Sequence, residues 1–230
     1  MPADNIWYFS RDPDDPVQRI VVPPEAGDSI LVVPSPVVSN PKPANELFQK
    51  ALQVAGKEVD DRISLSTNRD RVTEYLSLFV DPPPASFYAN YCEAGLTWAV
   101  CNAYCLLNGI TLTDANRLNA LKRVRSDINQ YYFLTSAYVP DTMNDTIAPR
   151  DTFLSDPAAA KAGYLAFFNW GNDNTHPPPF PQHIGFVESL ADSKLNTVEF
   201  NTSRPDDNVP GAVARKSRDL KFVVGYAKTY

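Results

Sequence analysis

The sequence lacks a long apolar run and any cluster of basic residues. Its acidic residues outnumber its basic ones, 27 to 21, and give the 230-residue chain a formal net charge of −6. An acidic chain without a basic patch is not attracted to phosphate backbones, so we expect no nucleic-acid partner. A membrane-spanning helix needs about 18 or more consecutive apolar residues, so we expect no membrane span either.

The first residues also lack the features of a signal peptide. Residues 1–9 (MPADNIWYF) have neither a basic start nor an apolar core. Secretory leaders need both. We therefore expect synthesis in the cytoplasm, and any action outside the cell would require release or non-classical secretion.

Cysteine and histidine are scarce, at three and two residues. An odd cysteine count does not favour a disulfide framework. Cys101 and Cys105 lie one helical turn apart, but a zinc site would need more ligands than His176 and His183 can add. We interpret these two thiols as small buried hydrophobes and expect no metal and no cofactor.

Proline is abundant, at 21 residues against only 9 glycines, which indicates many rigid, extended connections. The first 45 residues are proline-rich and carry short β-branched runs at 19–22 and 29–33, typical of a hairpin or edge strands. We assign residues 1–85 to an N-terminal extension or lobe of unknown role. It could be a targeting lobe, an inhibitory flap or part of the core.

After the proline-rich start, the chain divides into a helical part, which begins inside the extension, and a strand-rich part. Apolar spacing predicts helices, and alternation with turn-forming links predicts strands. Helices are expected at about 44–55, 92–107 and 113–120, a helix or extended segment at 72–80, and strands at 163–170, 183–189, 197–201 and 222–227. Helices followed by an antiparallel meander predict an α+β fold.

Cys92 is the strongest candidate for a reactive residue. It lies where a loop runs into the helix predicted at 92–107, with Asn108 and Gly109 closing the helix. A cysteine is a good nucleophile only as a thiolate, and a helix N-terminus and a nearby imidazolium both favour that form. The free N–H groups of the first turn could also bind an oxyanion.

A general base and an orienting group are available further along the chain. His183 opens an apolar strand, which would hold it rigidly, whereas His176 lies in a proline-rich loop, so we favour His183 as the base. Glu199 and Asn201 occupy alternate positions of the next strand, and alternate side chains share one face of a sheet. Either could orient the imidazole of His183.

These segments resemble the CHAP domains, the cysteine, histidine-dependent amidohydrolase/peptidase group of the NlpC-type, papain-like superfamily. The similarity covers roughly residues 85–230, although Phe200 stands where the family has glycine. The matching segments are 91–100 (YCEAGLTWAV), 183–187 (HIGFV), 199–203 (EFNTS) and 223–226 (VVGY).

The resemblance implies a papain-like core at residues 86–230, with a helical half carrying the nucleophile and an antiparallel C-terminal sheet. It implies hydrolysis of amide bonds in peptidoglycan, as an N-acetylmuramoyl-L-alanine amidase or a peptide endopeptidase. Cys92 would be the nucleophile, His183 the base, and Glu199 or Asn201 its orienting partner.

The setting and two other functions remain open. Action at the cell wall fits a phage lysin, or an effector injected into a rival cell, which could have a cognate inhibitor or immunity protein. One alternative is an inactive binding or structural protein on the same fold, which the change to Phe200 would favour. The other is a cysteine transferase or deamidase acting on protein.

Overall fold

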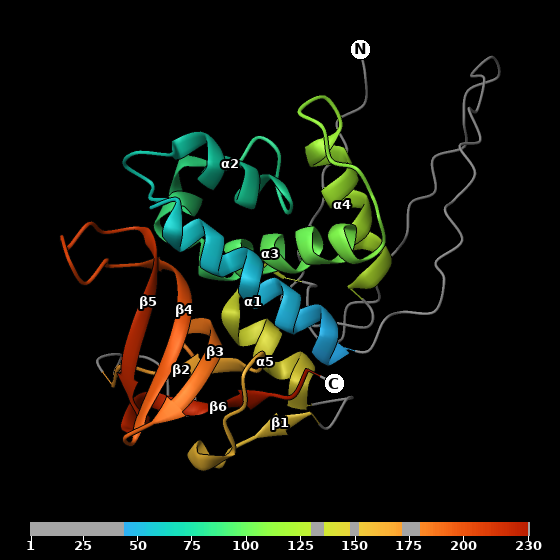
Figure 1. Ribbon diagram of the computed structural model, residues 1–230. Helices are drawn as coiled ribbons and strands as arrows, with labels where there is room; N and C mark the ends of the chain where they lie inside the picture. Colours follow the sequence, from blue (N-terminus) through green and yellow to red (C-terminus); the bar gives the residue numbers. More distant parts are fainter. Residues whose placement is uncertain (1–43, 130–135, 148–151, 172–179, 230) are drawn as a thin grey trace, which may run out of the picture. The chain divides into compact units, whose positions relative to one another are not determined.

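The computed structural model describes residues 44–129, 136–147, 152–171 and 180–229, which belong to one compact unit. They form an α+β fold in which helices cover one face of an antiparallel sheet (Figure 1). The helices are α1 (Ala44–Asp60), α2 (Arg69–Ser77), α3 (Cys92–Leu107), α4 (Arg117–Ile128) and α5 (Val139–Ile147), with short 3-10 turns at Ala85–Ala89, Pro157–Ala159 and Leu220–Phe222.

The sheet has six strands in the order β1-β6-β2-β3-β4-β5. Strands β2 to β5 are a meander, and the last strand returns to pair with β2 rather than with β5. The strands are β1 (Phe153–Leu154), β2 (Leu165–Phe168), β3 (His183–Ala191), β4 (Lys194–Thr202), β5 (Ala212–Asp219) and β6 (Val223–Ala227).

Helix α3 lies at the centre of the core. Nearly all of its side chains are buried, because α1, α2 and α4 pack on its outer sides and β3 and β4 lie beneath it. A helix that is apolar on every side is typical of such a central position. The strands that α3 contacts, β3 and β4, are those that carry His183 and Glu199.

Part of the predicted N-terminal extension shares this core. Helix α1 packs on α3, and Phe48 and Tyr75 are completely buried in the same cluster as Leu96. The boundary expected at residue 85 thus lies inside the compact unit. The strands expected at 19–22 and 29–33 lie outside the described residues.

Several element boundaries differ from expectation. Helix α1 continues past Gly56 to Asp60, and α4 begins after Asn116 instead of at Thr113 or Asp114. The side chain of Asn116 accepts a hydrogen bond from the backbone N–H of Thr113 at 2.7 Å, which stabilises a turn ahead of the helix. None of the helices within the described ranges is long and apolar enough to cross a membrane.

Candidate functional site

Cys92 is the first residue of α3 and is 7% exposed. Tyr91 precedes the helix, and its carbonyl oxygen accepts the Gly95 N–H at 2.9 Å as the first intrahelical bond. The first N–H groups of a helix have no carbonyl partner within it and form the positive end of its dipole. Cys92 therefore lies at the N-terminus of α3, the position that the sequence predicts for it.

His183 and Glu199 are in direct contact. The Nε2 of His183, the first residue of β3, lies 3.0 Å from Oε2 of Glu199 on β4. Both side chains are buried, and that of Glu199 is completely so. With Nε2 on the carboxylate, Nδ1 is the ring nitrogen left for the Cys92 thiol.

Gly185 explains how Glu199 reaches His183. Residues 183 and 185 share one face of β3, and a Cβ atom on Gly185 would stand 2.7 Å from Cγ of Glu199. Such a contact is closer than van der Waals packing allows. The glycine of the HIG segment therefore leaves the space in which the glutamate side chain lies.

Arg218 on β5 is a site residue that the sequence did not single out. Its Nε donates to Oε1 of Glu199 at 2.8 Å, and its Nη2 donates to Oε2. Thr197 donates to the same Oε1 at 2.7 Å. A bidentate guanidinium and a hydroxyl keep this buried carboxylate ionised and fix its orientation.

The electrostatics of the pair follow from these contacts. Burial raises the pKa of Glu199, but the hydrogen bonds from Arg218 and His183 outweigh it and lower that pKa to about 2. Burial likewise lowers the pKa of His183, but hydrogen bonds and charges from Cys92 and Glu199 raise it to about 9. At neutral pH the imidazole is therefore positively charged and the carboxylate negative.

Aromatic rings enclose the charged groups. Phe168 and Trp170 are stacked with ring centroids 5.5 Å apart, and the ring of His183 lies 5.9 Å from that of Trp170. The guanidinium of Arg218 lies 4.6 Å from the centroid of the Trp170 ring. These apolar walls limit water around His183 and strengthen its interaction with Glu199.

Asn201 lies elsewhere than the sequence suggests. Its side-chain Nδ2 donates to the carbonyl oxygen of Ala89 at 2.8 Å, in the turn just before Cys92. The pairing of β4 with β5 shifts register between Glu199 and Thr202, and Asn201 has a positive φ of 55°. This bulge breaks the alternation that would have placed Asn201 beside Glu199.

Cys101, Cys105 and Glu93 are polar residues of α3 for which no contact with His183 or Glu199 is seen within the described residues. Cys101 and Cys105 are completely buried in the hydrophobic core, in keeping with their interpretation as packing residues. His176 lies outside the described residues. Glu93, next to Cys92, is completely buried, and its Oε2 has no hydrogen-bond partner among the described residues.

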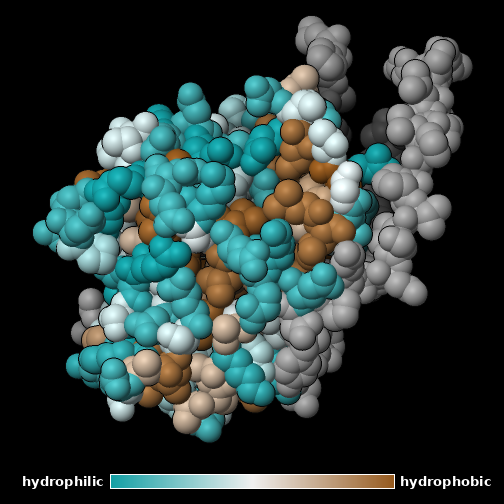
Figure 2. All heavy atoms as spheres, viewed as in Figure 1, coloured by the Kyte–Doolittle hydropathy of each residue, from teal (hydrophilic) through white to brown (hydrophobic). Residues whose placement is uncertain are grey.

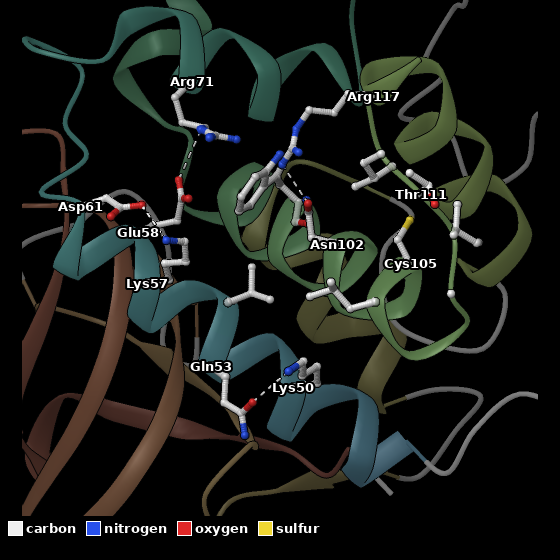
Figure 3. Close-up of a pocket in the computed structure, with 16 residues that line it drawn as sticks. Lys50, Gln53, Lys57, Glu58, Asp61, Arg71, Asn102, Cys105, Thr111 and Arg117 are labelled. Atoms are coloured by element: carbon white, nitrogen blue, oxygen red, sulfur yellow. Dashed lines mark hydrogen bonds and ion pairs between the residues drawn. The ribbon is translucent and has the colours of Figure 1, made fainter. Parts of the chain in front are cut away.

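A hollow of about 670 Å³ lies on a different side of α3, between its C-terminal half and α1 (Figure 3). Hydrophobic side chains are exposed around it (Figure 2), among them Leu106, which is 60% exposed. Trp98 forms part of its wall, but Cys92, His183 and Glu199 do not line it. The hollow is therefore separate from the candidate site.

The chain matches no protein-family model, no curated protein and no solved structure. Within the described ranges, no three His, Cys, Asp or Glu residues are grouped so that they could hold a metal ion. A thiol at a helix start, an imidazole and an ionised carboxylate are the groups used for nucleophilic acyl transfer.

Proposed function

We propose that the protein is a cysteine-dependent hydrolase of amide bonds, with Cys92 as nucleophile, His183 as general base and Glu199 as the group that orients the imidazole. The observation that carries the proposal is the contact of His183 Nε2 with the fully buried Glu199 carboxylate, which Arg218 holds from its other side. Desolvation makes buried charges costly, and here the charged groups of His183, Glu199 and Arg218 offset that cost by pairing with one another.

The proposed reaction has two steps: the acyl group is first transferred to Cys92, and the resulting thioester is then hydrolysed. His183 carries the proton of the Cys92 thiol as an imidazolium, and the sulfur attacks the carbonyl carbon of the amide as a thiolate. His183 returns that proton to the leaving nitrogen, which departs as an amine and leaves a thioester on Cys92. His183 then takes a proton from water, the resulting hydroxide attacks the thioester, and Cys92 is released with a carboxylic acid product.

The proposed substrate is peptidoglycan, cleaved between muramic acid and L-alanine or within the peptide. The support is the resemblance of the four segments to CHAP domains. The proposed place of action is the cell wall, reached by release or non-classical secretion. We further propose a papain-like arrangement, in which α3 supplies the nucleophile and the antiparallel sheet supplies base and carboxylate.

The test compares wild-type protein with Cys92→Ala on purified sacculi. Chromatography and mass spectrometry of the soluble fraction should show muropeptides released by wild type and none by the variant. Cys105→Ala is the matched control, because it removes a thiol from the same helix outside the site, and it should keep full release. Equal release by Cys92→Ala and wild type, or none by either, contradicts the proposal for that wall type.

A further inference from the structure

The bulge on β4 is directly connected to the turn that precedes the nucleophile. Besides the hydrogen bond from the Asn201 side chain to Ala89, the phenol of Tyr91 lies against the Asn201 backbone N–H and donates to the Gly211 carbonyl at 2.6 Å. Tyr91 is completely buried. The residues on either side of Asn90 are thus both attached to the same end of the sheet.

This connection joins the two parts of the proposed site. Glu199, which holds His183, is only two residues before Asn201 on the same strand. Ala89 is three residues before Cys92. The distance between thiol and imidazole therefore depends on how the turn at 89–91 is fixed to the end of β4.

Asn201 suits this position for two reasons. Its backbone is left-handed, a conformation that asparagine and glycine adopt more readily than other residues. Its amide is also a donor, which an acceptor carbonyl such as that of Ala89 requires. An aspartate could adopt the backbone but would place an oxygen against that carbonyl.

From these contacts we infer that Asn201 is a positioning residue for the nucleophile: its amide fixes the turn before Cys92 so that the thiol faces His183. This inference rests on the proposed function, and it assigns Asn201 to the thiol side of the site instead of the imidazole side. The residue acts through Ala89 and needs no contact with substrate.

The experiment measures the rate at which iodoacetamide alkylates Cys92, by mass spectrometry of the Cys92 peptide, in Asn201→Gly and Asn201→Asp. Each rate is divided by that of the urea-unfolded protein. We expect both variants to slow Cys92 alkylation at pH 7 by about tenfold or more, as a misplaced reactive group does. Thermal unfolding is recorded for the same samples.

Asn208 provides a matched control. It also has a left-handed backbone, with φ of 56°, and it is exposed in the turn after β4. Asn208→Gly and Asn208→Asp should leave the alkylation rate at the wild-type value. A loss of stability caused by replacing an asparagine with a left-handed backbone should appear in the Asn208 variants as well as in the Asn201 variants. Slower alkylation of Cys92 should appear only in the Asn201 variants.

Three results would overturn the inference. One is wild-type alkylation in both Asn201 variants. Another is slowing by Asn201→Asp alone, which would indicate a charge effect and not a lost hydrogen bond. The last is a wild-type Cys92 that reacts no faster folded than unfolded. None of these requires a substrate, so failure to release muropeptides refutes the proposed function separately.

Discussion

At the scale of single residues, Arg218 decides how the candidate site is charged. It makes two hydrogen bonds to Glu199, a third to Thr202 at 3.2 Å, and stacks on Trp170. Its planar guanidinium matches the two carboxylate oxygens, which a lysine ammonium cannot do. The orientation of His183 therefore depends on a residue one strand beyond Glu199.

We expect Arg218→Lys to lower kcat/KM for peptidoglycan fragments by roughly 10- to 100-fold, because Glu199 loses its fixed orientation and the imidazole with it. The control is Arg215→Lys on the same strand, whose partners Glu188 and Asp60 lie at the surface. It should change kcat/KM less than about twofold, since exposed ion pairs contribute little. Equal effects of the two substitutions would contradict the role of Arg218.

Glu93 is a completely buried carboxyl with a hydrogen bond from Thr97 to Oε1 at 3.5 Å and none to Oε2 among the described residues. Burial, followed by the nearby Cys92, raises its pKa well above the ordinary value of 4.5, although Thr142, Thr97 and Arg125 act the other way. The folded protein therefore binds this proton more tightly than the unfolded chain does. The stability that the protonated form contributes is complete below the unfolded pKa and is lost as pH rises above it.

Glu93→Gln should therefore become more stable relative to wild type as the pH rises. The glutamine resembles the neutral acid in shape but has no proton to lose. Urea unfolding of both proteins at pH 4.5, 6 and 8 should give a difference in unfolding free energy that grows in favour of the variant. A difference that is constant or falls with pH would show that Glu93 is ionised in the folded protein.

At the scale of elements, α3 and β4 approach each other closely at one point. A Cβ atom on Gly95 would stand 2.2 Å from Cδ1 of Phe200, whose ring is also edge-on to Tyr75 at 5.4 Å. Phe200 is thus a buried core residue whose ring occupies the space that a side chain at Gly95 would need. The phenylalanine at position 200 therefore packs between β4 and α3.

Gly95→Ala should destabilise the protein by about 1–3 kcal/mol through overpacking, although alanine normally favours a helix. In Gly95→Ala with Phe200→Leu, part of that loss should be recovered, since the smaller side chain leaves room for the methyl group. A double-mutant cycle from urea unfolding should give a coupling of at least about 0.5 kcal/mol. Strict additivity would mean that the two residues do not share this space.

Helices and strands with a regular spacing of apolar residues could be predicted from the sequence. Elements without such spacing were missed. Helix α3 spans 92–107 as expected, because its apolar residues and its closing Asn108-Gly109 agree. Strand β5 was missed, because it reads as ARKSRD after two apolar residues and its polar side chains point to solvent or to Glu199. The omission of β5 is also why Arg218 was missed.

At the scale of the whole molecule, the site is assembled from residues that lie between positions 92 and 218 of the chain. The sequence was enough to predict which helix or strand carries Cys92, His183 and Glu199. Each of these residues begins or lies in an element with a regular apolar pattern. The contacts of the Asn201 side chain could not be predicted, because they depend on a bulge in the pairing of β4 with β5. Pairing register is a tertiary property that spacing within one strand does not reveal.

The His183–Glu199 contact also links the stability of the whole fold to pH. The pKa of His183 is raised in the folded protein from 6.5 to about 9, so this group stabilises the fold fully below pH 6.5 and loses its contribution as the pH rises through 9. That of Glu199 is lowered from 4.5 to about 2, so its contribution is present above pH 4.5 and is lost as the pH falls through 2. Both contributions to stability are complete between pH 4.5 and pH 6.5.

The measurement is the difference in unfolding free energy between wild type and His183→Gln, from urea titrations at pH 5 to 10. We expect wild type to be favoured most below pH 6.5, with its advantage shrinking as the pH approaches about 9, because only the charged imidazole attracts Cys92 and Glu199. Taking the difference removes the other groups that titrate in this range. A difference independent of pH would show that His183 is not protonated more readily in the folded protein, and the charged pair proposed for catalysis would then not exist.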